Sequence, residues 1–426
     1  MRIVFYVLVA LVSGAVSFAG SWLIWKLSHR YRLYPKIRER DVHTRPTPRL
    51  GGIALFLAIA VAFAVGSQLP PLALIFTQPH QVLAVLGAAL LIVLIGVADD
   101  LWDLDWFTKL AGQILAAGLI AWQGVQISWL PLPGVVASLA PYQSVALTIF
   151  VIVLVMNAVN FIDGLDGLVA GVATIASAAF FVYGYYVSYG PTEQSDYFNL
   201  AQFITAALIG ACVGFLPWNF RRDDERPARL FMGDSGALLV GLLMATSTVA
   251  LAGQNVPAGA REGLVALIPV ILPLAVLIVP LADFALAILR RLRAGKSPFS
   301  ADRKHLHHRL LDMGHSHRHA VMIFYAWTAV ASVGMLLFLI PEQGLLIGGL
   351  VLLGGFLVCA IVTLAPLSRR KAIEAAVQSA PPAVAADAGV TEYDPLDAAA
   401  GAAVIEHTDA EAAEALQRLH EKEASS

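Results

Sequence analysis

The sequence predicts an all-α membrane protein, because the chain is apolar overall and its apolar residues gather in long runs. Of its 426 residues, 58% are hydrophobic and only 14% are charged, whereas soluble domains carry about 25% charged residues. The mean hydropathy is +0.73. A chain with so little polar surface is expected to have the bilayer as its solvent, crossed about eleven times.

Apolar runs long enough to cross about 30 Å of hydrocarbon recur along the first 365 residues, the predicted transmembrane domain. The first run is interpreted as a retained span, since it lacks a small-residue cleavage site and ends in Trp22, Trp25 and Lys26. Residues 366–426 are rich in Ala and Glu and are expected to form a disordered cytoplasmic tail. The expected spans are residues 3–27, 50–67, 82–98, 108–123, 144–160, 166–188, 200–218, 235–252, 263–290, 320–340 and 344–365.

Basic residues concentrate in alternate loops, and this pattern predicts the orientation. With the N-terminus outside, only Arg2 and Arg261 of the 28 Lys and Arg residues lie on the outer side. Positive residues of short loops stay cytoplasmic. We therefore expect a multi-pass protein of the bacterial inner (plasma) membrane whose acidic motifs lie at the cytoplasmic face.

The first acidic motif ends the third expected span. Asp99, Asp100, Asp103 and Asp105 place four carboxylates within seven residues. Adjacent carboxylates repel one another unless a cation intervenes, and Mg²⁺ prefers oxygen ligands from one or two carboxylates together with substrate phosphates. The alternative is a solvated acidic loop that ends a helix.

A second motif, Asn-Ala-Val-Asn-Phe-Ile-Asp-Gly-Leu-Asp-Gly, contains Asn157, Asn160, Asp163 and Asp166. If residues 163–167 already belong to the next helix, the two acids share one face. They would then lie near N–H groups that favour anions. The alternative is a turn chosen for its backbone dihedral angles, which leaves two amides and two acids at membrane depth unexplained.

Two further motifs combine polar groups with basic residues. Phe231-Met232-Gly233-Asp234-Ser235-Gly236 precedes an apolar helix, which Asp234 or Ser235 could cap. Four arginines precede it on a short cytoplasmic loop, so Asp234 and these arginines together could hold Mg²⁺ and a pyrophosphate. The last motif holds Arg303, Lys304, His305, His307 and His308 and fits phosphate recognition better than zinc, since the zinc spacing His-Glu-x-x-His is absent. A loop attracted only to anionic lipid is its alternative.

Two further features lie outside these four motifs. Asp283 lies about two turns inside the ninth span, and we expect it to pair with a basic side chain; indirect support of the site is the alternative. His315, His317 and His319 are interpreted as loop surface.

These four motifs, in this order, resemble those of the polyprenyl-phosphate N-acetylhexosamine-1-phosphate transferases, and the likeness covers most of residues 1–365. The segment Pro-Thr-Pro-Arg-Leu-Gly-Gly, residues 46–52, also matches. His305-Leu306-His307-His308 after Asp302-Arg303 looks like the branch that transfers N-acetylglucosamine-1-phosphate. The translocase of peptidoglycan synthesis has instead three histidines followed by an aromatic residue and an acid.

The resemblance implies a role for each matching residue. Asp234 would be the metal ligand for Mg²⁺, or for Mn²⁺ in its place. Asp99 and Asp100 would handle polyprenyl phosphate, and Lys109 would help to bind phosphate. The remaining assignments are a nucleotide site of Asn157, Asn160, Asp163 and Asp166, stacking of Phe231 on uracil, and a grip on pyrophosphate and sugar by Arg303, His305, His307 and His308.

The predicted reaction moves N-acetylglucosamine-1-phosphate from UDP-GlcNAc to polyprenyl phosphate in a cell-envelope glycan pathway. Transfer of phospho-MurNAc-pentapeptide is the alternative substrate, and a transporter for lipid-linked or nucleotide sugars is the alternative class. Transporters tend to place ionisable residues near the midplane, whereas these acids gather at one face. No nucleic acid is expected as a partner, and both a monomer and a homodimer stay open.

Overall fold

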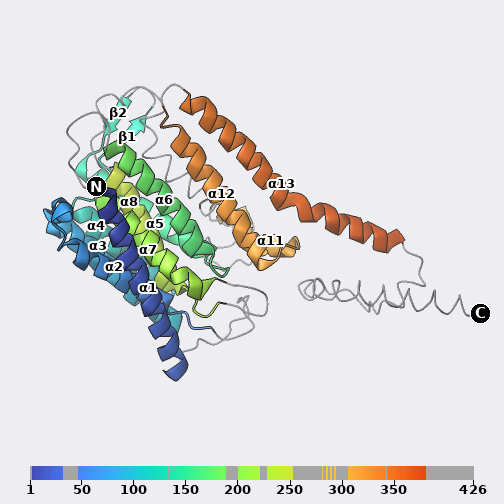
Figure 1. Cartoon of the computed structure of the whole chain (residues 1–426), viewed down its shortest axis with the longest axis horizontal. Coiled ribbons are helices and arrows are strands. Elements are labelled where there is room, and N and C mark those ends of the chain that lie inside the picture. The colour runs from blue at the N-terminus through green and yellow to red at the C-terminus, as the bar shows by residue number, and fades with distance from the viewer. Residues whose placement is uncertain are drawn as a thin grey trace, which may run out of the picture.

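The computed structural model describes residues 2–31, 47–132, 135–188, 200–220, 228–252, 306–340 and 343–379, with isolated positions between 281 and 293. Within these ranges the chain is almost entirely helical (Figure 1). The helices are α1 (Arg2–Tyr31), α2 (Gly51–Gly66), the 3₁₀ helix η1 (Pro70–Phe76), α3 (Pro79–Trp102), α4 (Trp106–Trp122), α5 (Pro141–Ile162), α6 (Leu168–Ser188), α7 (Leu200–Asn219), α8 (Gly233–Ala252), α11 (Leu306–Asp312), α12 (His317–Leu337) and α13 (Gly344–Ser379).

Eight of the described helices are long and apolar enough to cross a membrane, and they coincide with eight of the expected spans. The apolar helices α2 and α4 have only 16 and 17 residues. Taken together, α2 and η1 are also long and apolar enough to cross a membrane, but the chain bends by 113° between them. The expected span 263–290 lies mostly outside the described residues. A multi-pass helical membrane protein is therefore confirmed, while the total of eleven spans stays a prediction.

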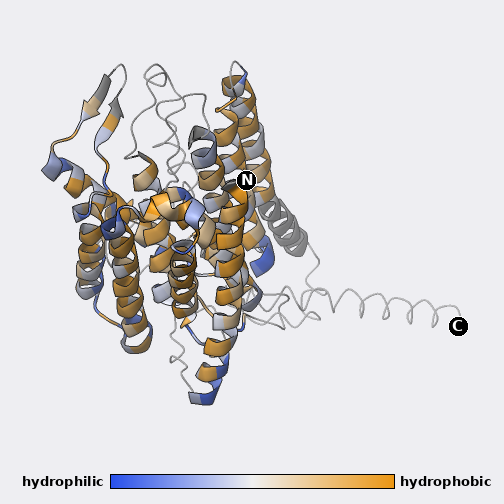
Figure 2. Ribbon diagram, turned by 60° about the vertical axis from the view of Figure 1, so that its left-hand side comes forward, coloured by the Kyte–Doolittle hydropathy of each residue, from blue (hydrophilic) through white to orange (hydrophobic). Residues whose placement is uncertain are grey.

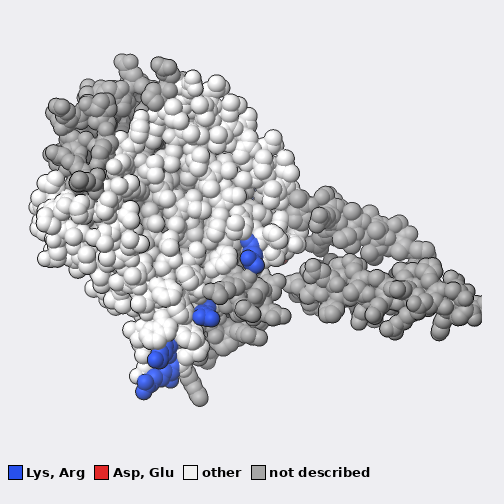
Figure 3. Space-filling model, in the orientation of Figure 1, with Lys and Arg blue, Asp and Glu red and all other residues white. Residues whose placement is uncertain are grey.

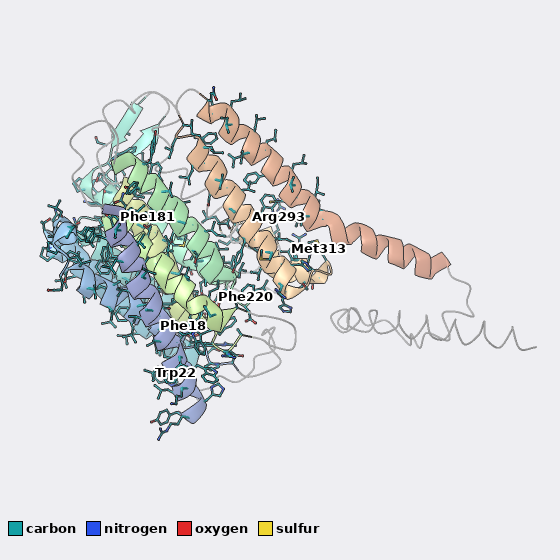
Figure 4. All side chains as sticks on the ribbon, in the orientation of Figure 1. Phe18, Trp22, Phe181, Phe220, Arg293 and Met313 are labelled. Atoms are coloured by element: carbon teal, nitrogen blue, oxygen red, sulfur yellow. The ribbon has the colours of Figure 1, made fainter. Side chains whose placement is uncertain are left out.

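Helices α7 and α8 form the buried centre of the bundle. In their most apolar stretches, 72% and 78% of the residues are buried. Helix α1 packs along α7, where the hydroxyl groups of Ser13 and Ser17 each donate a hydrogen bond to an α7 carbonyl at 2.7 Å. Phe18 and Trp22 lie further along α1 (Figure 4), and the Phe18 ring is 5.5 Å from that of Trp218. Apolar residues dominate the helices in Figure 2, as a lipid environment requires.

A short antiparallel hairpin was not predicted. Strands β1 (Trp129–Leu132) and β2 (Val135–Ser138) pair with Trp129 opposite Ser138, between α4 and α5. Pro-Leu-Pro-Gly in this stretch is the sequence signal for the turn. The hairpin lies at one end of the bundle, and α1 terminates at the other end (Figure 1).

The last helix extends beyond the expected boundary of the membrane domain. The backbone of α13 remains helical as far as Ser379, although we placed the start of the tail at residue 366. The rest of the tail lies outside the described residues. His315 also differs from its interpretation as loop surface, because its ring nitrogen Nε2 lies 3.0 Å from the Thr363 carbonyl oxygen of α13.

Candidate active site

The predicted acidic motifs meet where three helices begin or end. Asp99 lies in the last turn of α3, Lys109 in the first turn of α4, and Asp234 in the first turn of α8. The Lys109 ammonium lies 2.6 Å from the Asp99 carboxylate and 3.2 Å from that of Asp234. The two outer residues are 135 positions apart in the chain, so the bundle fold creates this ion-pair triad.

Asp100, the next residue after Asp99, binds the backbone at the start of α8. Its carboxylate accepts hydrogen bonds from the backbone N–H groups of Asp234 at 3.1 Å and Ser235 at 3.3 Å, and from the Ser235 hydroxyl at 2.9 Å. The side chain is buried, with 7% exposure. The alternative of a cap by Asp234 or Ser235 is therefore wrong, because a carboxylate of another helix takes that place.

The segment that resembles the family motif Pro-Thr-Pro-Arg-Leu-Gly-Gly pairs with the backbone just before α8. Phe231 donates its backbone N–H to the Pro48 carbonyl at 2.8 Å, and its own carbonyl accepts the N–H of Gly51 at 3.1 Å. A third bond joins the Gly52 N–H to Met232 at 3.2 Å. These bonds place the start of α2 beside Asp234.

The motif between α5 and α6 forms a turn rather than the start of a helix. Helix α5 ends at Ile162 and α6 begins at Leu168, so Asp163 and Asp166 do not share a helical face. Gly167 has a φ of +81°, which closes the turn in a conformation that suits glycine. The helical alternative for residues 163–167 is thus wrong, because this backbone bend interrupts the helix before Leu168.

The two acids of this turn have different surroundings. Asp166 is buried, and its carboxylate accepts the N–H of Ala228 at 3.1 Å. Nearby, the Asn219 side chain accepts the Gly167 N–H at 3.0 Å and donates to the Leu230 carbonyl at 3.1 Å. Asp166 thereby holds Ala228, just before α8, although its assignment to the nucleotide site stays a prediction.

Asp163 belongs to the acidic centre. Burial raises the pKa of its carboxyl well above the usual value, and neighbouring carboxylates add to the rise. Those carboxylates belong to Asp234, Asp100 and Asp166, whereas the positive charge of Arg49 lowers the pKa. Asp163 therefore binds a proton more readily than an exposed aspartate does.

The two asparagines of the motif approach the same centre from α5. Asn160 lies within hydrogen-bonding reach of Asp234, and among the described residues its buried side-chain oxygen has no hydrogen-bond partner. One turn earlier, Asn157 donates to the Gln113 side chain of α4 at 2.5 Å and to the Val153 carbonyl at 2.8 Å.

This set of donors fits a divalent cation with oxygen ligands. Over the described ranges, no three His, Cys, Asp or Glu side chains form a ready ligand set. Mg²⁺ nevertheless uses only one or two carboxylates and completes its shell with water and substrate phosphates. The clustered carboxylates and the buried Asn160 oxygen match that demand.

The remaining predicted site residues are only partly described. Phe231 lies in the pairing segment before α8, while His307 and His308 contribute their backbones to α11. Arg303 and His305 lie outside the described residues, as does Asp283. The convergence of the fourth motif with the other three therefore stays a prediction.

Sequence reasoning missed three residues beside the site. These are Arg49, whose charge acts on Asp163, Gln113, which binds Asn157, and Asn219, which links the turn to the α8 approach. Gln113 and Asn219 are polar and buried, with 3% and 2% exposure. Buried polar residues in apolar helices are themselves a signal, and both could have been found on that criterion.

The chain is similar in sequence to known glycosyl transferases and phosphotransferases. The model of the family described as glycosyl transferase family 4 matches residues 82–252. Decaprenyl-phosphate N-acetylglucosaminephosphotransferase of Mycobacterium leprae is 40% identical over 85% of this chain and 91% of its own length. The protein of that name from Mycobacterium tuberculosis H37Rv is 41% identical over 85% of this chain and 89% of its own length.

A more distant relative from Bacillus subtilis is 31% identical over 67% of this chain and 72% of its own length. It is named a probable undecaprenyl-phosphate N-acetylglucosaminyl 1-phosphate transferase. The region matched by the family model holds the ion-pair triad and the α5–α6 turn. With such identity across most of its length, the chain belongs to the polyprenyl-phosphate N-acetylhexosamine-1-phosphate transferase family.

Proposed function

We propose that this protein transfers N-acetylglucosamine-1-phosphate from UDP-GlcNAc to polyprenyl phosphate and releases UMP. The product is polyprenyl-diphosphate-GlcNAc, which begins a cell-envelope glycan. The observation that carries the proposal is the convergence of Asp99, Lys109 and Asp234 in a chain 40% identical to a phosphotransferase of this kind. The active site is placed at the cytoplasmic face of the inner membrane, where UDP-sugars are made.

The proposed step is a direct displacement at phosphorus. An oxygen of the lipid phosphate forms a bond to the β-phosphorus of UDP-GlcNAc, while the bond from that phosphorus to the bridging oxygen breaks and UMP departs. Asp99 keeps the lipid phosphate deprotonated, and Lys109 attracts the phosphates that gather beside it. Such reactions depend on positioning and electrostatic stabilisation more than on covalent chemistry.

Asp234 is the proposed ligand of Mg²⁺, or of Mn²⁺ in its place, with the Asn160 oxygen within the same centre. The ion would neutralise charge that develops on the departing UMP. Asp234→Asn should abolish turnover, because an amide is a neutral and weaker ligand. Unchanged product formation by this variant across a Mg²⁺ titration would contradict the assignment.

Product analysis tests the function directly. Purified protein with Mg²⁺ and decaprenyl phosphate is incubated with UDP-GlcNAc or with UDP-MurNAc-pentapeptide, and the lipid product is identified by mass. We expect product only with UDP-GlcNAc. Product only with the pentapeptide would reverse the choice of sugar, and transport of labelled sugar into proteoliposomes without lipid product would favour a transporter.

Isotope exchange separates direct displacement from a covalent route. In a direct mechanism, labelled UMP enters UDP-GlcNAc only when the lipid acceptor takes part. Exchange without acceptor would instead indicate an enzyme-bound phosphosugar with an aspartate as nucleophile. We expect no exchange until polyprenyl-diphosphate-GlcNAc is present.

A further inference from the structure

We propose that the adjacent aspartates of the first motif have separate tasks, and that Asp100 is a positioning residue that holds Asp234 in place. Asp99 faces the reacting groups, whereas Asp100 fixes the first turn of α8. The kinetic part of this inference rests on the proposed function. Its structural part can be tested without any substrate.

In the described part of the chain, every side-chain hydrogen bond of Asp100 goes to the start of α8. One carboxylate oxygen accepts the Asp234 N–H, and the other accepts both the N–H and the hydroxyl group of Ser235. The first N–H groups of a helix have no hydrogen-bond partner within the helix, and the helix dipole favours an acceptor with negative charge there. These three bonds satisfy acceptor positions of the buried Asp100 side chain.

Asp99 has the opposite surroundings, although it is the next residue in the chain. Consecutive residues of an α-helix point about 100° apart. Asp99 therefore faces Lys109 at 2.6 Å, and its other oxygen accepts the Leu104 N–H at 2.8 Å. Of the two aspartates, only Asp99 forms an ion pair with Lys109 in the described part of the chain, and Lys109 also contacts Asp234.

The backbone around the α8 start leaves Asp100 little freedom. Gly233 has a φ of +72°, and a Cβ atom there would lie 2.6 Å from the Asp100 carboxylate. A Cβ at Gly96 of α3 or Gly52 of α2 would collide with Ser235. The first turn of α8 is thus seated against two helices, and Asp100 supplies the polar bonds that hold it.

This arrangement matters because a ligand of a metal or phosphate must keep its direction closely. The side chain of Asp234 projects from a backbone whose N–H is bound by Asp100. If that bond is lost, Asp234 can turn away while its carboxylate stays chemically intact. The effect should appear first in metal binding and only then in the chemical step.

The substrate-free test is hydrogen exchange of the purified full-length protein in detergent. In Asp100→Ala, amides in a peptide covering residues 231–238 should exchange at least about 10-fold faster, because their acceptor is gone. Asp99→Ala should leave that peptide protected and serves as the matched control. Equal protection in wild type and Asp100→Ala would overturn the proposal, and so would equal loss of protection in both variants.

The kinetic test compares Asp100→Asn with Asp99→Asn. An asparagine still caps a helix, so Asp100→Asn should keep most of its kcat at saturating Mg²⁺ and need about 10-fold more Mg²⁺ for the half-maximal rate. Asp99→Asn should lose kcat at every Mg²⁺ concentration. If Asp100→Asn is as inactive as Asp99→Asn and added Mg²⁺ restores nothing, Asp100 is a reacting group and the proposal fails.

Two controls keep the inference separate from the proposed function. Ser235→Ala removes one of the three bonds, and it should give a Mg²⁺ requirement between those of wild type and Asp100→Asn. A wild-type protein that forms no product from UDP-GlcNAc would refute the proposed function. The exchange experiment would still decide the task of Asp100.

Discussion

Lys109 holds together two carboxylates that would otherwise repel each other. Its ammonium contacts both Asp99 and Asp234, and its side chain is 23% exposed, so a ligand can reach it. In the protein interior such charge-assisted contacts are stronger than in water. The same cation is therefore available to a phosphate group that enters between the two acids.

Replacement of Lys109 tests this role. Lys109→Gln should lower kcat/KM for UDP-GlcNAc by about 10²–10³-fold, because one preorganised charge is lost from the reacting phosphates. Lys26→Gln is the matched control, since Lys26 is an exposed cation that stacks on Trp22 of α1. Steady-state assays of both variants provide the measurement, and similar losses in the two would contradict a specific role.

Asp163 predicts a dependence of stability on pH. Its pKa is raised in the folded state, while an unfolded chain has the ordinary value of 3.8. As the pH rises from 3.8 toward the folded pKa, the unfolded state releases its proton first, so the folded state loses stability. Asp163→Asn cannot ionise and should escape this loss.

Thermal unfolding in detergent without substrate or Mg²⁺ measures the effect. The midpoint of Asp163→Asn should exceed that of wild type at pH 8, and the difference should shrink toward pH 4, where the Asp163 carboxyl of the folded protein is protonated. A difference that stays constant between pH 4 and pH 8 would show that ionisation of Asp163 is not its cause.

At the scale of elements, close contact between α1 and α7 supports the helices that form the site. A Cβ atom at Gly210 of α7 would collide with the backbone carbonyl of Ala10. Small residues let membrane helices approach closely, and lipid supplies no hydrophobic force to replace that contact. The α1–α7 pair therefore depends on a residue without a side chain.

Gly210→Ala should destabilise the protein by about 1–3 kcal/mol, as overpacking does. Gly349 on α13 is the matched control, because a Cβ atom there meets nothing within 4 Å. The thermal midpoint should fall for Gly210→Ala and stay close to that of wild type for Gly349→Ala. Equal midpoints for the two variants would argue against tight α1–α7 packing.

At the scale of the whole molecule, the polar motifs collect at one end of the bundle. The Lys and Arg side chains visible in Figure 3 lie toward that end of the molecule. Lys26 and Arg30 belong to the last two turns of α1. The hairpin lies at the other end. This separation supports the predicted orientation, with the hairpin outside and the site in the cytoplasm.

Labelling of single cysteines in intact cells tests the orientation. Native Cys212 and Cys359 are buried and can first be replaced by serine. A membrane-impermeant maleimide should then label Ser138→Cys of the hairpin but not Asp312→Cys of α11, both at exposed positions. Permeabilised cells should show both labelled, and the reverse pattern in intact cells would invert the topology.

The sequence by itself determined that the chain is a multi-pass helical membrane protein of this family. Long apolar runs leave the backbone no alternative to helices in lipid, so eight spans were located correctly. The motifs around Asp99, Asn160 and Asp234 were recognisable because acids and amides are rare at membrane depth. Such signals are local and do not require knowledge of how helices pack.

Only the tertiary structure decided which partners each acid contacts. The sequence places Asp99 and Asp100 side by side, but packing turns one toward Lys109 and the other toward the amides of α8. The turn at Asp163 likewise depends on contacts with α7 and the α8 approach, which lie more than 50 residues away. A side chain's direction and partners are set by helices distant in sequence, and no local pattern contains that information.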